Sequence, residues 1–252
     1  MKILFHEKFC ESDYASNGAA DPGRMEAIMD MISQDHSFEI IRPHPADEEA
    51  LLLAHTPNYV DTIRANPKLY DMASLAAGAA IMASDIGIDG EPAFACLRPP
   101  GHHAYRDSSW GYCVFSNMGI ALLRLKQQRI KSAFILDFDA HTGDGTKAVL
   151  SGWKDCHILN PYAETSEAYI EVIRNFIRDI PLVDIVCVCA GFDSYKKDVG
   201  RKLSTSDFYL IGDMMKRFAK RAAKNRRFAI LEGGYYQPDL GKNVLAFCHG
   251  FM

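Results

Sequence analysis

Seven short apolar runs divide this chain, and longer stretches with helical periodicity separate most of them. Each run spans four or five residues, which is the usual length of a buried strand. Alternation of strands and helices predicts a mostly parallel sheet with helices on both faces, and therefore an α/β fold. The runs lie at residues 2–5, 38–41, 93–97, 133–136, 156–159, 185–189 and 228–231.

The stretches between the runs carry the signals of helices. Residues 24–32 follow an Asp21-Pro22-Gly23 turn, and Thr56 can cap a helix that continues through residue 63. Further helices are predicted at residues 73–83, 117–125, 166–177 and 206–223. We find no repeat, low-complexity segment or flexible linker, so residues 1–252 are predicted to form a single domain.

The composition and the N-terminus exclude several classes of protein. The 252 residues include 28 Lys and Arg against 32 Asp and Glu, a formal net charge of -4 at pH 7. Because this balance gives no overall positive field, we predict no direct nucleic-acid binding. No run reaches the roughly 20 apolar residues that span a bilayer, and charged residues follow Phe5 too early for a signal peptide. We expect a cytoplasmic protein without membrane partners.

Cysteines and a basic segment give weaker signals. The seven cysteines include no C-x-x-C pair, which is typical of reduced thiols. Residues 216–227 are rich in Lys and Arg, several of them on one helical face. A solvated face with its positive charge near a helix C-terminus explains this segment best, and an acidic partner is the alternative.

Polar residues follow four of the predicted strands, at the edge where ligands bind in parallel α/β sheets. His102 and His103 follow the run at 93–97, and Asp193 follows the run at 185–189. The other two runs lead into Asp137-Phe-Asp-Ala-His-Thr-Gly-Asp144 and Glu232-Gly-Gly-Tyr235. We therefore predict that four strand ends converge on one site.

The D-x-D-x-H pattern at this edge is a candidate metal site. Asp137, Asp139 and His141 alternate at a period of two, so their side chains share one face while the chain stays extended. With Asp193 from a neighbouring strand end, two carboxylates and an imidazole could hold a divalent ion and leave a position open for water. Taken alone, the pattern is explained equally well by a turn or a hydrogen-bonded strand terminus. The polar residues at the neighbouring strand ends favour the metal site.

In successive motifs that cover nearly the whole chain, the sequence resembles the zinc-dependent histone deacetylase superfamily. That superfamily includes acetylpolyamine amidohydrolases and acetoin-utilisation proteins. The motifs are Arg98-Pro-Pro-Gly-His-His-Ala104, Gly111-Tyr-Cys-Val-Phe-Ser-Asn117, Asp137-Phe-Asp-Ala-His-Thr-Gly-Asp-Gly-Thr146, Ala190-Gly-Phe-Asp193 with Asp198, and Leu231-Glu-Gly-Gly-Tyr235, with fainter matches at residues 21–28 and 55–59. The resemblance implies an arginase-like, three-layer α/β fold with a mostly parallel sheet.

The resemblance also implies which residues hold metal ions. Asp139, His141 and Asp193 match the ligands of one zinc ion per chain, although the residues alone do not distinguish Zn²⁺ from Fe²⁺. A K⁺ or Na⁺ ion near Asp137, Asp139 and His141 is common in the family. Asn160 stands where a serine is expected near that second ion, which weakens the expectation of a monovalent cation.

The remaining matches have roles in amide hydrolysis. His102 and His103 match the tandem histidines, which Asp137 and Asp144 would orient and charge. A histidine suits proton transfer because its ordinary pKa is about 6.5. We assign His103 as the principal general base and acid and His102 as its electrostatic partner. Tyr235, on a flexible Gly-Gly hinge, would donate to the tetrahedral oxyanion.

Three further residues are expected around the substrate. Gly111 and Tyr112 match positions that line the acyl-lysine channel, although Tyr112 alone would be read as a core residue. Arg24 matches a position near the acetate exit, and an exposed arginine at a helix start explains it nearly as well.

Two loops that build the substrate tunnel in the family are short in this chain. Residues 160–166 pass straight into a predicted helix, and the region around residues 66–74 is abbreviated. We therefore expect a shallow, open site unless a second subunit of a homo-oligomer supplies a wall.

The sequence predicts a zinc-dependent amide hydrolase that removes an acetyl or related acyl group from a small acylated amine or acyl-lysine. A zinc-bound water would attack the amide. One alternative is a binuclear manganese ureohydrolase, but the segment from Asp193 to Asp198 lacks the D-x-D that a second metal needs. The other alternative is an inactive metal-binding scaffold, which the presence of His102, His103 and Tyr235 argues against.

Overall fold

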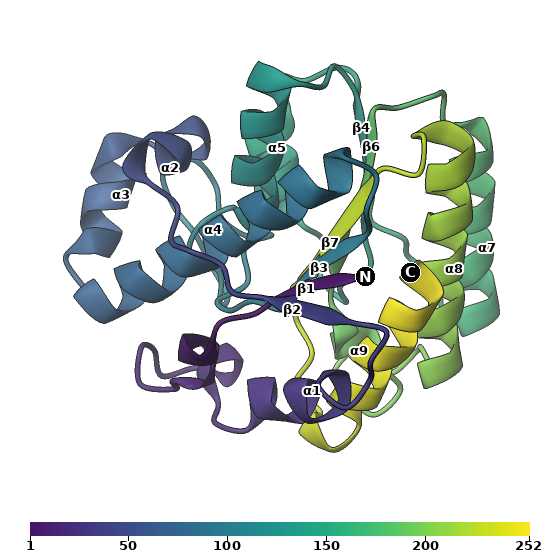
Figure 1. Ribbon diagram of the computed structural model, residues 1–252, viewed down its shortest axis with the longest axis horizontal. Coiled ribbons are helices and arrows are strands. Elements are labelled where there is room, and N and C mark those ends of the chain that lie inside the picture. Colours follow the sequence, from purple (N-terminus) through teal and green to yellow (C-terminus); the bar gives the residue numbers. More distant parts are fainter.

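The computed structural model describes all 252 residues and contains one seven-stranded sheet whose strand pairs are all parallel (Figure 1). The strand order is β2-β1-β3-β7-β6-β4-β5. All seven predicted strands are present, and the predicted parallel α/β architecture is confirmed. The strands are β1 (Lys2–Leu4), β2 (Glu39–Ile41), β3 (Ala93–Ala95), β4 (Ala133–Asp137), β5 (Cys156–Leu159), β6 (Ile185–Ala190) and β7 (Arg227–Leu231).

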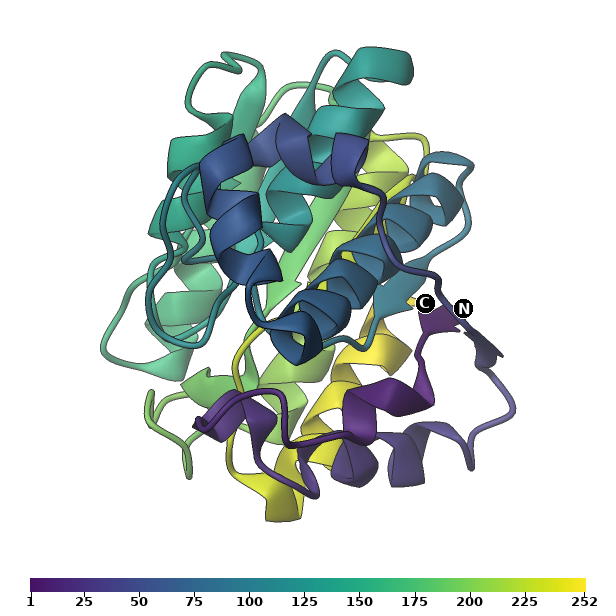
Figure 2. The ribbon, with the colours of Figure 1, turned by 90° about the vertical axis from the view of Figure 1, so that its left-hand side faces the viewer.

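Helices cover both faces of the sheet. The helix α4 packs on β1, β3 and β7 and against α5, whereas α8 and α9 pack together on the opposite face (Figure 1). Figure 2 shows α1 beside α9, which brings the two ends of the chain together. The helices are α1 (Arg24–Ile32), α2 (Glu48–Ala54), α3 (Pro57–Arg64), α4 (Pro67–Ile88), α5 (Asn117–Gln128), α6 (Asp144–Leu150), α7 (Ser166–Asp179), α8 (Thr205–Ala222) and α9 (Gln237–Phe251), with short 3₁₀ turns at Glu7–Cys10, Gly18–Ala20 and Phe192–Ser194.

Three of these helices, α2, α6 and α9, are absent from the sequence prediction. The helix α9 contains Gly241 and Gly250, which lower intrinsic helix propensity. Both glycines lie where neighbouring helices come close, since a Cβ at Gly241 would lie 2.0 Å from Ala27 O and one at Gly250 would lie 2.1 Å from Tyr209 O. The close packing of α9 therefore requires these two glycines, and the same glycines weaken the helical signal in the sequence.

The helix α4 has 22 residues and extends beyond both ends of the helix predicted at residues 73–83. By length and composition it could cross a membrane, contrary to the sequence expectation, but 78% of its most apolar window is buried inside the protein. Gly78 lies where the 44–46 segment crosses the helix, and a Cβ there would lie 1.9 Å from His44 O. These contacts are those of a core helix that covers the sheet.

The register of the central strands aligns their carboxyl ends at one edge of the sheet. Asp137 of β4 is paired with Cys189 of β6, and Ala190 of β6 is paired with Leu231 of β7. On the other side of β7, Ala95 of β3 is paired with Ile230. The segments that follow these four strands therefore begin at the same level, as predicted.

One buried histidine fixes the loop that precedes α5. His55 is 1% exposed, and its Nε2 accepts a hydrogen bond from Ser116 N at 2.9 Å. Its ring packs on Tyr59 and Phe115, and Tyr59 Oη donates to Val114 O. Burial lowers the pKa of His55 to about 4, so the ring is neutral and can accept this hydrogen bond.

We expect His55 to destabilise the protein at acid pH. The unfolded chain takes up a proton on this ring near pH 6.5 and the folded protein only near pH 4, so the free energy of unfolding falls as the pH falls through this window. Relative to a His55→Gln variant, the free energy of unfolding of wild type should fall by up to about 1.4 kcal/mol for each unit by which the pH falls. Urea unfolding between pH 4.5 and 7.5, with chelator present, measures this difference; a difference independent of pH would contradict the prediction.

Candidate metal and catalytic site

A cavity of about 290 Å³ opens at the carboxyl edge of the sheet. Its walls come from the segments that follow β3, β4 and β7, and from Val199 beyond β6. The predicted residues on its walls are His102, His103, Gly111, Tyr112, Asp139, His141 and Tyr235. The structure thus brings residues from all four strand ends to one place.

Three predicted metal ligands form a compact cluster beside this cavity. His141 Nδ1 lies 3.1 Å from Asp139 Oδ1 and 3.1 Å from Asp193 Oδ2. One ligand atom from each residue lies within 4.8 Å of the other two. Both carboxylates are buried, whereas the His141 side chain is half exposed. The cluster is therefore open to the cavity on its histidine side.

The chemistry of this cluster fits a divalent cation. Burial and the negative charge of Asp139 raise the pKa of Asp193 to about 7. Hydrogen bonds to Asp139 and Asp193 raise the pKa of His141 to about 10. The only polar neighbour of the buried Asp193 Oδ2 in this cluster is His141 Nδ1. Two buried carboxylates beside one imidazole form an oxygen and nitrogen donor set suited to zinc.

Backbone N–H groups hold the two carboxylates in place. Asp139 accepts hydrogen bonds from His141 N and Gly233 N, each at 2.9 Å, and Asp193 Oδ1 accepts one from Ala140 N at 2.9 Å. A Cβ at Gly233 would lie 2.6 Å from Asp139 Oδ2, and one at Gly191 would lie 2.1 Å from the same atom. Both glycines are required because the strand ends approach the ligands so closely.

Asp137 is not one of the three clustered ligands, and its carboxylate pairs with a histidine. The common face predicted for Asp137, Asp139 and His141 applies only while the chain stays extended. The strand β4 ends at Asp137, and the chain then turns. Asp137 Oδ2 instead lies 3.1 Å from His102 Nδ1. Burial opposes the charged form of His102, but the charges of Asp139 and Asp137 outweigh it and raise the pKa of His102 well above its ordinary value.

His103 has a different environment from its neighbour. Its Nδ1 lies 2.8 Å from Asp144 Oδ1 at the start of α6. Burial and the charge of His102 lower the pKa of His103 despite the opposing effect of Asp144. The pKa values of the two consecutive histidines therefore shift in opposite directions, which favours the charged form of His102 and the neutral form of His103.

Backbone hydrogen bonds anchor Tyr235 at the end of the Gly-Gly segment. Asp198 Oδ2 accepts hydrogen bonds from Tyr235 N at 2.6 Å and Tyr236 N at 2.7 Å. Gly234 has a φ of 123°, a conformation that favours glycine. Burial raises the pKa of Tyr235 well above its ordinary value, so its hydroxyl keeps its proton.

Arg24 is buried, so the reading as an exposed helix-start arginine is wrong. It is 1% exposed and donates to Gly234 O and Glu232 O, at 2.9 and 2.6 Å. Its guanidinium also lies over the Tyr235 ring, 5.5 Å from the centroid. Tyr112 packs edge-on against the same ring and is 38% exposed. Arg24 thus supports the loop that carries Tyr235.

The segment expected to hold a monovalent cation makes several internal hydrogen bonds. Asn160 Nδ2 donates to Asp137 O at 3.3 Å. Phe138 O accepts hydrogen bonds from Tyr169 Oη and Ser194 Oγ, at 3.2 and 3.0 Å. Protein side chains therefore already occupy these carbonyl oxygens.

Sequence reasoning missed two residues at this site. Trp110 lies on the cavity wall and stacks on His103. Glu232 is fully buried, and its Oε2 accepts hydrogen bonds from Gly101 N and His102 N. Trp110 stands directly before the Gly111 motif and is one of only two tryptophans, which is the signal that could have found it.

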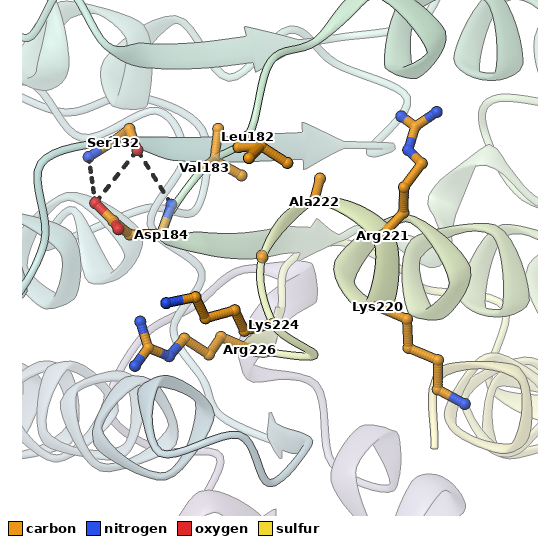
Figure 3. A pocket seen from close by; sticks show the side chains of 10 residues that line it. Ser132, Leu182, Val183, Asp184, Lys220, Arg221, Ala222, Lys224 and Arg226 are labelled. Carbon is orange, nitrogen blue, oxygen red and sulfur yellow. Dashed lines mark hydrogen bonds between the residues drawn. The ribbon is translucent and has the colours of Figure 1, made fainter.

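The basic segment lines a second cavity, of about 370 Å³, near the amino ends of β4 and β6. Figure 3 shows that its cations diverge: Lys224 and Arg226 extend toward Asp184, whereas Lys220 and Arg221 point away from them and from each other. Because these side chains do not converge on one point, the arrangement favours a solvated basic face.

The chain is similar to known proteins in sequence and in fold. A model of the histone deacetylase domain matches residues 62–169. A probable deacetylase of Archaeoglobus fulgidus is 29% identical over 313 positions, which cover 99% of this chain and 86% of the relative. A histone deacetylase-like amidohydrolase of Pseudomonas aeruginosa is 25% identical, with 88% of this chain and 73% of the relative covered. The human polyamine deacetylase HDAC10 is also 25% identical, and the match covers 96% of this chain and 45% of the relative.

The crystal structure of the HDA15 HD domain has the same fold, with a TM-score of 0.84 at 20% identity, covering 98% of this chain and 90% of that one. The fold is therefore the arginase-like α/β fold of the histone deacetylase domain. In sequence the chain is similar to histone deacetylase-like proteins, as its motifs suggest. Its relatives are deacetylases and amidohydrolases, which supports an enzyme.

We expect Gly233→Ala to weaken metal binding. The added methyl group would press on both Asp139 and Asp193, because its ideal position lies 2.6 Å from Asp139 Oδ2 and 2.9 Å from Asp193 Cγ. Displaced ligands should lower metal affinity about 10- to 100-fold. Titration of the metal-free protein with zinc measures this change. Gly152→Ala is the matched control, since a Cβ there meets nothing within 4 Å. Equal zinc affinity in the two variants would contradict the prediction.

Proposed function

We propose that this protein is a zinc-dependent deacetylase that removes an acetyl or related acyl group from an acylated amine. The observation that carries this proposal is the convergence of the Asp139, His141 and Asp193 cluster with two histidine–carboxylate pairs and Tyr235 around one cavity. Amide hydrolysis needs an activated nucleophile, a stabilised oxyanion and a proton for the leaving amine. Residues suited to each need lie at this site.

Asp139, His141 and Asp193 would hold the zinc ion, since one ligand atom from each lies within 4.8 Å of the other two. A zinc ion bound there supplies a Lewis acid and lowers the pKa of a nearby water toward about 7.

His103 is the proposed general base and general acid. Its lowered pKa keeps the ring neutral, and Asp144 at Nδ1 favours the tautomer whose Nε2 is free to accept a proton. His102, with a raised pKa and Asp137 at its Nδ1, remains charged. This charge keeps the pKa of His103 low, so that the proton His103 takes up is readily passed to the leaving amine.

Tyr235 is the proposed donor to the oxyanion. Its hydroxyl stays protonated because burial raises its pKa, and Asp198 and Arg24 restrict its loop and ring. A donor fixed before the reaction loses little energy to reorganisation as charge develops on the acyl oxygen.

The proposed substrates are small acylated amines, such as acetylated polyamines, or accessible acyl-lysines. The half-exposed side chain of His141 supports this proposal, because a substrate can reach the cluster without a long tunnel. The alignment with the Archaeoglobus relative supports it too: its 313 positions exceed the 252 residues of this chain, so the relative has insertions.

No observation favours the ureohydrolase alternative. The second group of potential ligands, His102, Cys113 and Glu232, already makes hydrogen bonds that hold the active-site backbone. Asp198, which would have to supply a carboxylate, binds the backbone of Tyr235 and Tyr236. Metal analysis distinguishes the two enzymes, since one zinc per chain supports the deacetylase and two manganese ions support the ureohydrolase.

We expect Tyr235→Phe to lower kcat about 10²- to 10³-fold while zinc content stays unchanged, because only the oxyanion donor is removed. Assays of zinc-loaded protein on acetyl-lysine peptides and acetylated polyamines measure this effect. Tyr209→Phe removes a hydroxyl from an exposed tyrosine on α8 and is the matched control. If wild type turned over none of these substrates faster than Tyr235→Phe, the proposal would be overturned.

A further inference from the structure

The indole of Trp110 contacts both members of the His103–Asp144 pair. Its ring stacks on the His103 imidazole with centroids 3.7 Å apart and an interplanar angle of 26°. Its Nε1 donates to Asp144 at 3.0 Å from Oδ2 and 3.3 Å from Oδ1. His103 Nδ1 lies 2.8 Å from the same Oδ1. One side chain therefore bridges the proposed base and the carboxylate that orients it.

The His103 ring has two close aromatic neighbours. The His102 ring lies 4.0 Å from the His103 centroid at an interplanar angle of 38°, and the indole lies closer and more nearly parallel. His103 is 5% exposed, whereas Trp110 is 48% exposed. The indole therefore covers the imidazole on the side of the site that is open to solvent.

The hydrogen bond to Asp144 limits how that carboxylate can turn. Asp144 is the first residue of α6, and its side chain is about one-third exposed. Gly145 N also donates to Asp144 Oδ1, at 2.9 Å. With Oδ1 held there and the indole N–H closest to Oδ2, the carboxylate keeps Oδ1 directed at His103 Nδ1. The indole therefore helps to fix both the orientation of the imidazole and its tautomer.

We propose that Trp110 is a positioning residue for His103: it clamps the imidazole by stacking and anchors Asp144 through its indole N–H. This inference rests on the proposed function, in which His103 transfers the protons. It differs from a role in substrate contact alone, since the indole N–H is directed at Asp144 and the ring plane at His103. In a site with short loops, this one side chain provides the enclosure that longer loops would otherwise give the base.

The first test needs neither metal nor turnover. Two-bond ¹H–¹⁵N spectra of metal-free protein, with His103 assigned from a His103→Ala variant, report which ring nitrogen carries the proton. We expect a single form protonated at Nδ1 in wild type, a mixture of tautomers in Trp110→Ala, and an intermediate result in Trp110→Phe. Trp153→Phe is the control, because Trp153 is buried and donates to Lys131 O instead. An unchanged His103 signal in Trp110→Ala overturns the proposal.

The second test separates the effect of the stacking from that of the indole N–H. It measures kcat and KM on acetyl-lysine peptides and acetylated polyamines. Trp110→Ala loses the stack and the N–H, and should lower kcat about 10- to 100-fold with a smaller change in KM. Trp110→Phe keeps an aromatic ring but lacks the N–H, and should lower kcat about three- to tenfold with KM nearly unchanged. Trp153→Phe should match wild type.

These outcomes separate the two proposals. A rise in KM with unchanged kcat in Trp110→Ala would mean that the indole only contacts substrate, and would overturn the positioning role while leaving the deacetylase intact. Full recovery of kcat in Trp110→Phe would overturn the role of the N–H. If wild type showed no turnover, the proposed function would fail, and the His103 spectra would still decide whether Trp110 positions the ring.

Discussion

The site depends on two buried carboxylates, Asp139 and Asp193, that the fold holds side by side. Like charges in a poorly hydrated place repel, and the raised pKa of Asp193 reflects that repulsion. Backbone N–H groups and His141 offset part of it, and a divalent cation would offset the rest. Because Gly191 and Gly233 have no side chains, the segments after β6 and β7 can approach closely enough to enclose the pair. The paths of three loops thus follow from one electrostatic requirement.

The same edge of the sheet separates the roles of two consecutive histidines. His102 points to Asp137 at the end of β4, whereas His103 points to Asp144 at the start of α6, seven residues later. The short turn between those aspartates therefore supplies both partners. His102 lies within 3.8 Å of Asp139 and is stabilised as a cation, and its charge in turn keeps the pKa of His103 low. The division into a charged partner and a neutral base is a property of the environment, since the two side chains are chemically identical.

Much of this arrangement was predictable from sequence, because buried parallel strands leave apolar runs and their carboxyl ends leave polar motifs. What failed depended on tertiary contacts. The period-two argument assumed that the chain stays extended beyond Asp137, but the strand ends at that residue. Arg24 could not be placed, because its partners Glu232 O and Gly234 O lie more than 200 residues away in the chain. The helix α9 was hidden by the glycines that its packing requires. The stacking of the half-exposed Trp110 on His103 likewise leaves no periodic signal.

The short loops change what this site can recognise. Groups at the strand ends are anchored by the core, whereas loops tolerate deletion because they contribute few buried contacts. Deleting residues from such loops therefore removes the outer wall of a substrate channel without moving the catalytic groups at the strand ends. The exposed apolar side chains that remain at the rim are Trp110, Tyr112 and Val199, all close to the reacting position. In the proposed deacetylase, these side chains would contact the acyl group and the first atoms of the amine, because they line the cavity beside the metal cluster.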